Sequence, residues 1–114
     1  MKEIKAYFRP QFVDRVVDAL AKAGAQDVTV IHVDAFGPLA DADTDQHRFV
    51  RKYAEKYSSV IKLELVCGDE NAARFAEVIR ELTHTGQHGD GRIFIGALDE
   101  AINIRTGETG AKAL

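Results

Sequence analysis

The ten residues TGQHGDGRIF, Thr85–Phe94, join a glycine-rich turn to the start of an apolar run with the pattern of a strand. Glycine has no Cβ, so the backbone N–H groups around Gly86, Gly89 and Gly91 can turn toward a bound anion. Arg92 adds a planar cation at the edge of the turn. The same spacing also fits a glycine that ends a helix, followed by an ordinary turn. Spacing alone leaves an anion-binding loop and a simple turn open.

Periodic patterns on both sides of this stretch predict an α+β fold. Residues 2–8 alternate between apolar and polar side chains, as a half-buried strand does. Pro10 suits the first turn of a helix that runs to Gly24, and Asp69 is a candidate N-cap for a second helix that ends near residues 85–86. The order strand-helix-strand, repeated once, predicts a ferredoxin-like βαββαβ sandwich with an antiparallel sheet. The further strands are expected at 27–36, 58–67, 92–97 and 101–104.

Length and composition exclude several classes of protein. A chain of 114 residues without a Pro/Gly/Ser-rich linker predicts one domain spanning 1–114. No apolar run approaches the roughly 20 residues of a membrane helix, and no signal-peptide pattern is present, so we expect a cytoplasmic protein that does not insert into membranes. A net charge of −3 without a basic cluster argues against a nucleic-acid partner. The single cysteine, Cys67, is expected to be a buried strand residue.

The segment from about 38 to 57 has no clear helical or strand pattern and separates the second and third predicted strands. A connection of about 20 residues in so small a domain is unusual unless it is functional. Its first half alternates acidic residues and a histidine, which suit a divalent cation. A closing EF-hand glutamate and a second nearby histidine are lacking, so a solvated acidic loop is the other interpretation. The weak metal candidates are Asp41, Asp43, Asp45 and His47.

Two separated motifs resemble one known family. TGQHGDGRIF, followed by INIRTGETG at Ile102–Gly110, is similar to the nucleotide-binding loop and C-terminal loop of the PII signal-transduction proteins. The first 30 residues also match that family, so the resemblance covers the chain except for roughly 38–59. It identifies a divergent, PII-like member. The resemblance implies a homotrimer of ferredoxin-like subunits, with adenine nucleotides in the clefts between them and a long loop that docks on target proteins.

The resemblance also implies which residues bind the nucleotide. Phosphate contacts are expected from the glycine stretch and the C-terminal loop, and adenine contacts from the second and third strands. Three family positions depart from the pattern: Leu39, Val60 and Asn103 stand where PII proteins carry polar phosphate or magnesium contacts. Losing charge-assisted contacts weakens a triphosphate most, so ADP, AMP or a cyclic adenine nucleotide is expected to bind at least as well as Mg-ATP. The predicted nucleotide-binding residues are Thr29, Phe36, Gly37, Leu65, Val66, His88, Gly89, Asp90, Gly91, Arg92, Asn103 and Arg105.

The expected function is regulatory. The protein would bind adenine nucleotides and control a target, a membrane transporter or a metabolic enzyme, through the 38–57 loop. No nucleophile stands beside a base in a recognisable arrangement, so an enzyme is not expected. A metal-binding sensor on the same fold, linked to metal transport, is the alternative, and a weak hydrolase is the third hypothesis.

Overall fold

The computed structural model describes residues 1–37 and 57–114. In this part of the chain, the strands and helices follow the predicted order strand-helix-strand, strand-helix-strand. A short 3-10 helix precedes α1, and another lies at the C-terminus. The elements are β1 Lys2–Phe8, η1 Pro10–Phe12, α1 Val13–Lys22, β2 Thr29–Phe36, β3 Tyr57–Cys67, α2 Asp69–Thr83, β4 Gly91–Ala97 and η4 Gly110–Ala113.

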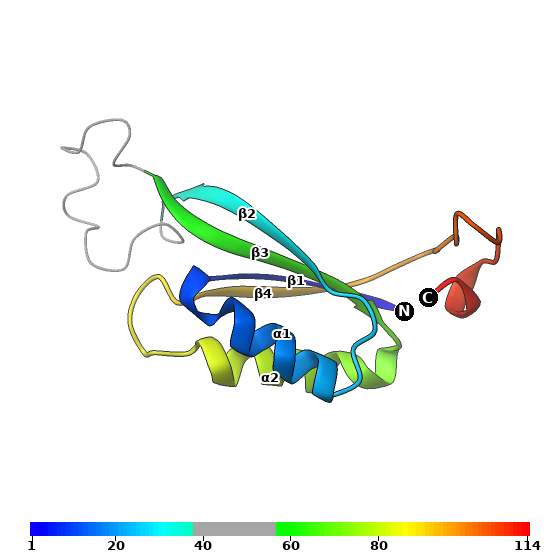
Figure 1. Ribbon diagram of the computed structural model, residues 1–114, viewed down its shortest axis with the longest axis horizontal. Helices are drawn as coiled ribbons and strands as arrows, with labels where there is room; N and C mark the ends of the chain where they lie inside the picture. Colours follow the sequence, from blue (N-terminus) through cyan, green and yellow to red (C-terminus); the bar gives the residue numbers. More distant parts are fainter. Residues whose placement is uncertain (38–56) are drawn as a thin grey trace.

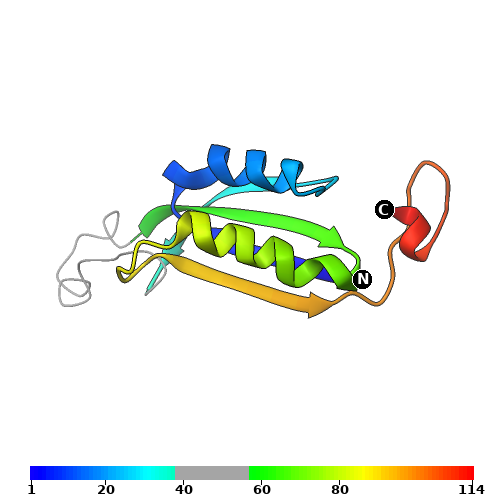
Figure 2. The same cartoon turned by 90° about the horizontal axis from the view of Figure 1, so that it is seen from below.

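The strands form one antiparallel sheet in the order β2-β3-β1-β4. Ile4 on the central strand β1 lies between Leu65 on β3 and Ile95 on β4. Both helices pack against the same face of this sheet, as Figure 1 and Figure 2 show from two directions. The structure therefore confirms the predicted ferredoxin-like α+β sandwich.

The hydrophobic core lies between the sheet and the two helices. Alternation along β1 directs Ile4, Ala6 and Phe8 toward the helices, where each is at most 2% exposed. Val16 and Leu20, one turn apart on α1, cover them and are fully buried. The whole cluster consists of Ile4, Ala6, Phe8, Val16, Leu20, Ile61, Leu63, Leu65, Cys67, Ala72, Phe75 and Ile79.

Cys67 is a buried strand residue, as the sequence predicted. Burial raises the pKa of its thiol above the ordinary value, with the nearby Glu70 carboxylate acting in the same direction. The thiol is therefore protonated at neutral pH. Since the thiolate is the reactive form, Cys67 is a poor nucleophile and serves as a core side chain.

The predicted fifth strand at 101–104 is wrong. Only an isolated bridge between Ile102 and Thr109 forms there, because the segment lies past the end of the sheet with no strand beside it. The second strand also begins at Thr29 and not at residue 27, since pairing with β3 starts there.

Both ends of α2 differ from the prediction. Gly68 occupies the N-cap position, whereas Asp69 begins the helix and its carboxylate pairs with the N-terminal ammonium of Met1 at 3.0 Å. The helix ends at Thr83, before residues 85–86, because His84 already has extended backbone angles of φ −73° and ψ 126°. Gly86 therefore belongs to the following loop and does not end the helix.

Residues 98–114 form a segment that we call the C-terminal arm. The arm continues from β4 and stands away from the sheet, at the end where the N-terminus lies (Figure 1). A backbone hydrogen bond from Leu98 N to Met1 O, 3.1 Å long, ties its first residue to β1. Ile104 is fully exposed and Ile102 is 66% exposed. In the described chain, the arm adds no residue to the hydrophobic core.

Within residues 1–37 and 57–114, no helix is both long and apolar enough to cross a bilayer.

Candidate functional site

Residues 85–91, which we call the glycine loop, connect α2 to β4. Thr83 is the last residue of α2, and its hydroxyl donates a hydrogen bond to the Ile79 carbonyl, at 2.8 Å. The chain then turns through Gly86 and Gly89, each with a φ of +90°. Such angles are costly for residues that carry a Cβ. The shape of the loop therefore depends on glycine at these two positions.

Gly91 is required for a different reason, which is its distance from the neighbouring strand. It pairs with Phe8, and a Cβ at this position would lie 1.8 Å from the carbonyl oxygen of Tyr7. Its φ of +128° is also in the range that favours glycine. The close approach of β4 to β1 thus sets where the loop ends.

The Asp90 carboxylate closes the glycine loop on itself. Its Oδ2 accepts hydrogen bonds from the backbone N–H groups of Thr85, at 2.8 Å, and Gly86, at 2.9 Å, and its Oδ1 accepts one from the Thr85 hydroxyl. Burial acts to raise the pKa of Asp90, but these hydrogen bonds outweigh it and hold the pKa below its ordinary value. The carboxylate therefore faces into the loop, where it fixes the loop's shape.

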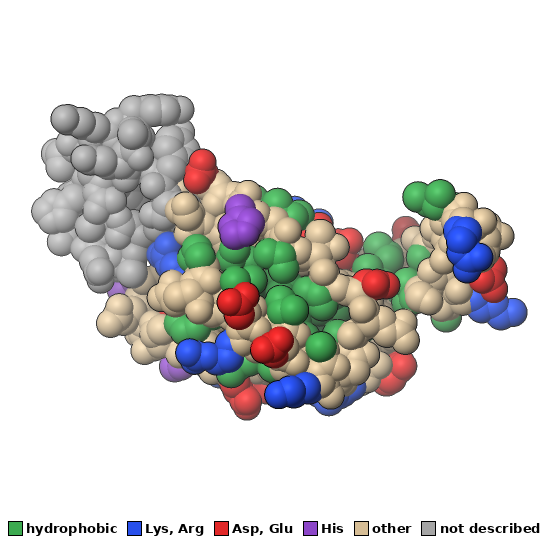
Figure 3. Space-filling view, viewed as in Figure 1, with side chains coloured by type: hydrophobic (Ala, Val, Ile, Leu, Met, Phe, Trp, Pro, Cys, Tyr) green, Lys and Arg blue, Asp and Glu red, His purple; other side chains and the backbone are tan. Residues whose placement is uncertain are grey.

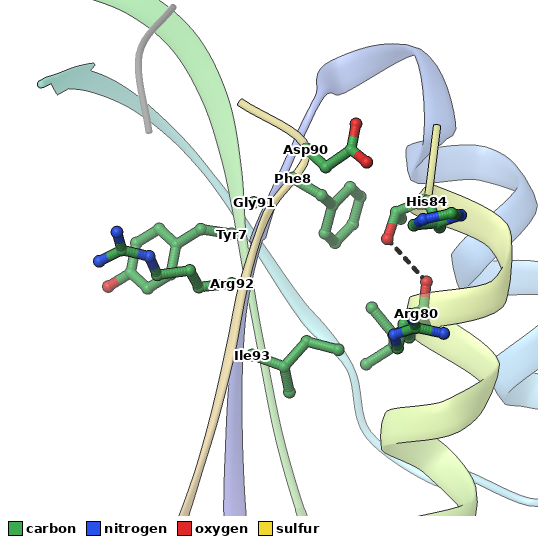
Figure 4. Close-up of a pocket in the computed structure, with 10 residues that line it drawn as sticks. Tyr7, Phe8, Arg80, His84, Asp90, Gly91, Arg92 and Ile93 are labelled. Atoms are coloured by element: carbon green, nitrogen blue, oxygen red, sulfur yellow. Dashed lines mark hydrogen bonds between the residues drawn. The ribbon is translucent and has the colours of Figure 1, made fainter. Parts of the chain in front are cut away.

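A cavity of about 260 Å³ lies between the end of α2 and the start of β4 (Figure 4). Phe8 and Ile93 extend into the space from the strands, while Arg80 and His84 lie on the helix side. The side chains of Tyr7 and Arg92 point to the other side of the strands, although both residues contribute to the edge of the cavity. Two charges of opposite sign, Arg80 and Asp90, share its rim.

Arg92 is therefore presented on the sheet face that the two helices do not cover. It pairs with Tyr7, and the Tyr7 ring packs edge-on against Phe94 with ring centroids 6.0 Å apart. Arg92 directly follows the glycine loop and is exposed, as is His88 within the loop. The structure thus places a cation directly beside the glycine loop.

Three of the predicted adenine-contact residues, Thr29, Leu65 and Val66, lie together. They line a cavity of about 330 Å³ together with the chain end at Leu114. Leu65 is only 3% exposed and belongs to the core, so its side chain is committed to packing. Thr29 is exposed and Val66 is half-buried, which leaves these two side chains accessible.

The other two predicted adenine contacts, Phe36 and Gly37, lie at the opposite end of β2 from Thr29. At about 3.3 Å per residue, the eight-residue strand separates them by roughly 23 Å. Phe36 is 57% exposed, and Gly37 has a φ of +95°. These residues and the Thr29 group therefore do not form one pocket within a single chain.

Asn103 and Arg105 lie on the C-terminal arm. The Asn103 side-chain oxygen accepts hydrogen bonds from the backbone N–H groups of Arg105, at 3.0 Å, and Thr106, at 3.1 Å. Arg105 is exposed, and its guanidinium has no hydrogen bond or ion pair within residues 1–37 and 57–114.

The glycine loop and the arm lie at opposite ends of β4 (Figure 1). Arg92 stands at the first end, beside the loop, and Arg105 stands beyond the second. Seven strand residues separate the two ends by roughly 20 Å. A single chain therefore keeps the predicted phosphate-binding residues in two groups.

Some of the predicted residues fall outside the described part of the chain. These are Leu39, where the resemblance places a lost polar contact, and the weak metal candidates. Val60 is described and is 2% exposed on β3. An apolar, buried side chain at this position supplies no charge to a ligand.

Comparison with known proteins identifies the family of the chain. Residues 1–108 match the family described as nitrogen regulatory protein P-II, and this match includes the glycine loop, Arg92 and Arg105. The chain belongs to the P-II family. This confirms the family resemblance of the two glycine-containing motifs and makes the protein a regulatory one of the nitrogen-regulation type.

Individual P-II proteins are similar along their whole length. The chain is 40% identical over 114 residues to a nitrogen regulatory protein P-II of Rhizobium meliloti (strain 1021), with both chains fully covered. It is also 40% identical to the protein P-II 2 of Methanothermobacter thermautotrophicus, covering 97% of that chain, and 35% identical to a P-II protein of Azospirillum brasilense, which it covers fully. Relatives from both Bacteria and Archaea thus share this chain's full extent.

Sequence reasoning missed Thr85, and it predicted ligand contacts at Asp90 and Asn103 without the structural roles that these residues have in their own loops. Thr85 was not among the predicted site residues, yet its hydroxyl and N–H both bind Asp90. The available signal was an aspartate near the end of a glycine-rich turn, because Asp side chains often accept hydrogen bonds from nearby backbone N–H groups. The same rule applies to Asn103 in the arm.

Proposed function

We propose that this P-II protein is a non-enzymatic regulator that binds adenine nucleotides in clefts between the subunits of a homotrimer. Each subunit is a single domain over residues 1–114. The preferred ligands are ADP, AMP or a cyclic adenine nucleotide, and bound nucleotide controls a target protein. The observation that carries the proposal is the preformed glycine loop with Arg92 beside it.

The glycine loop suits a phosphate because its shape exists before any ligand binds. Asp90 holds Thr85 and Gly86 in place, and glycines at φ +90° leave the backbone unobstructed by side chains. Because Asp90 and Thr85 already accept from the N–H groups of Thr85, Gly86 and Gln87, the phosphate would be bound by the later N–H groups of the loop. Backbone N–H groups and a guanidinium together form the usual anion-binding combination. Pre-organisation lowers the entropy lost on binding, which favours affinity.

The trimer is supported by the separation of Arg92 from Arg105. A phosphate chain can contact both cations only if one of them comes from another copy. The exposed apolar side chains also favour assembly, because burying apolar area contributes about 25 cal/mol per Å². The large apolar side chains left exposed are Val30, Phe36, Phe94, Ile95, Ile102, Ile104 and Leu114.

The preference for short phosphate chains follows from two described positions. Val60 is apolar and buried, and Asn103 directs its side-chain oxygen to its own turn. Each charge-assisted contact contributes roughly 1.5–3 kcal/mol, so a site without these contacts gains little from a third phosphate. Leu39, which lies outside the described residues, is a second apolar position in addition to Val60.

The segment 38–57 is proposed to dock on the target, which is a membrane transporter or a metabolic enzyme of the cytoplasm. Residues 38–56 of this segment lie outside the described part of the chain. Gly37 precedes the segment, and Tyr57, its last residue, begins β3. The metal-sensor alternative rests on the acidic positions of the same segment and stays a prediction.

Calorimetric titration with ADP, AMP, cyclic AMP and ATP, each with and without magnesium, tests the ligand. We expect Arg92→Ala and Arg105→Ala each to weaken ADP binding by about 1.5–3 kcal/mol, because each removes a charge-assisted contact. Arg15→Ala, on the exposed side of α1, is the matched control and should bind as the parent does.

Two results would contradict the proposal. Unchanged affinity in both arginine variants would mean that the glycine loop is only a turn. Mg-ATP binding more than about tenfold tighter than ADP and AMP would contradict the selectivity. The third phosphate and magnesium would then contribute more than about 1.4 kcal/mol to the binding free energy. Release of phosphate from ATP would favour the hydrolase hypothesis instead.

A further inference from the structure

Asn103 is the most connected residue of the C-terminal arm. Its backbone N–H donates to Glu108 O at 2.8 Å, and its backbone carbonyl accepts from Gly107 N at 2.8 Å. Its side-chain oxygen accepts from Arg105 N and Thr106 N. One residue thus closes the turn 103–108 through both its backbone and its side chain.

The side-chain contacts depend on the carboxamide. An asparagine oxygen reaches the backbone N–H groups two and three residues ahead, in the geometry of an Asx turn. Arginine has no acceptor atom and alanine has no polar side chain, so neither can hold the N–H groups of Arg105 and Thr106. Gly107, at φ +75°, completes the turn on the other side.

Little of the Asn103 side chain remains for a ligand. The oxygen already accepts two hydrogen bonds, and the Nδ2 group donates to Ala113 O at 3.5 Å, near the limit for such a bond. The residue is half-buried, whereas Arg105 two positions later is exposed. Asn103 therefore shapes the turn, whereas the exposed guanidinium of Arg105 is the group available to a ligand.

We propose that Asn103 is a positioning residue, which orders the turn that presents the Arg105 guanidinium to the nucleotide phosphate. This inference rests on the proposed function for the ligand, and on the hydrogen bonds of Asn103 for the mechanism. It assigns Asn103 to the shape of the turn and Arg105 to the contact with the ligand.

The test compares the parent with Asn103→Ala, Asn103→Asp, Arg105→Ala and the double variant Asn103→Ala/Arg105→Ala. Two quantities are measured for each: the Kd for ADP by calorimetry, and the hydrogen-exchange rates of the Arg105 and Thr106 amides by NMR. Glu108→Gln is the matched control. It lies in the same turn, and its side chain makes no hydrogen bond or ion pair within the described residues.

We expect Asn103→Ala to speed exchange of the two amides by at least about fivefold, because both lose their acceptor. We expect it to weaken ADP binding roughly tenfold, because the backbone that carries Arg105 is then less ordered. Asn103→Asp keeps the acceptor oxygen and should restore slow exchange. The double variant should bind no more weakly than Arg105→Ala alone, since Asn103 acts through Arg105.

Additive losses in the double variant would overturn the inference, because Asn103 would then contact the ligand by itself. Parent-like exchange in Asn103→Ala would overturn it as well. Circular dichroism should stay unchanged in all variants, since the arm adds no residue to the core. If the parent binds no adenine nucleotide, the proposed function fails, and the positioning role is then decided by the exchange rates alone.

Discussion

Gly91 shows how a single missing side chain determines the start of a strand. Its backbone lies so close to β1 that a Cβ would meet the carbonyl oxygen of Tyr7 at 1.8 Å, and that oxygen belongs to a paired strand that cannot move freely. The glycine loop can therefore end beside Phe8 only with glycine at this position.

We predict that Gly91→Ala destabilises the protein by about 2–4 kcal/mol, from the clash and the positive φ together. Urea unfolding measures the change. Gly96→Ala on the same strand is the control, because nothing lies within 4 Å of its added Cβ. Equal stability of the two variants would mean that β4 can shift away from β1 at low cost.

Asp90 provides a prediction about pH. Its pKa is lowered in the folded protein, so its contribution to stability is fully present above the ordinary carboxyl pKa of about 4. That contribution is lost as the pH falls through the lowered value. We expect Asp90→Asn to be less stable than the parent at pH 7, with the difference shrinking below about pH 4.

Unfolding of both proteins by urea at pH 7 and at pH 3 measures this difference. Asp18→Asn, at an exposed position on α1, is the matched control for replacing a carboxylate by an amide. A parent–variant difference that is the same at both pH values would show that the charge on Asp90 does not stabilise the loop.

At the scale of elements, α2 links the core to the glycine loop. Ile79 is fully buried beneath the sheet. Its carbonyl accepts a hydrogen bond from the hydroxyl of Thr83, which is the last residue of the helix. The buried residue Ile79 and the end of the helix, after which the glycine loop follows, are therefore only about one helical turn apart. A change in the core here is expected to affect both the stability and the loop.

We predict that Ile79→Ala lowers the free energy of unfolding by about 2–5 kcal/mol, because it removes buried methyl groups and leaves a cavity. Arg80→Ala, at the next and exposed position, is the control, with an expected change within about 0.5 kcal/mol. Thermal and urea unfolding check both. A loss below about 1 kcal/mol for Ile79→Ala would contradict the tight packing between α2 and the sheet.

At the scale of the whole molecule, apolar side chains remain on the surface. Figure 3 shows hydrophobic side chains gathered in the middle of one face, with charged side chains around them, and further apolar atoms on the projecting arm. Ile104, at 100% exposure, is the extreme case. Exposed apolar patches of this kind mark interaction surfaces.

We predict a homotrimer in sedimentation equilibrium, and dissociation toward monomer in Ile104→Asp, because the charge would be buried at an interface between copies. In an isolated chain this fully exposed position should tolerate aspartate, so circular dichroism should not change. Arg15→Ala should remain trimeric. A monomeric parent protein at micromolar concentrations would contradict both the proposed trimer and the proposed binding site between subunits.

The sequence by itself determined the elements and the family. Alternation in residues 2–8 and helical spacing from Val13 to Leu20 are local patterns, so they predicted β1 and α1 without knowledge of the rest of the chain. The two glycine-containing motifs likewise carried the P-II resemblance that the comparison confirmed. The predicted nucleotide contacts stay predictions.

The local structure of two loops decided where the side chains of Asp90 and Asn103 point. Both were predicted to bind nucleotide, and both accept hydrogen bonds from their own loops. The separation of Arg92 from Arg105 follows from the length of β4, which lies between them. Tertiary structure alone decided that residues 101–104 form no fifth strand. A strand needs a partner strand beside it, and no local period in a sequence encodes which distant part of the chain that partner is.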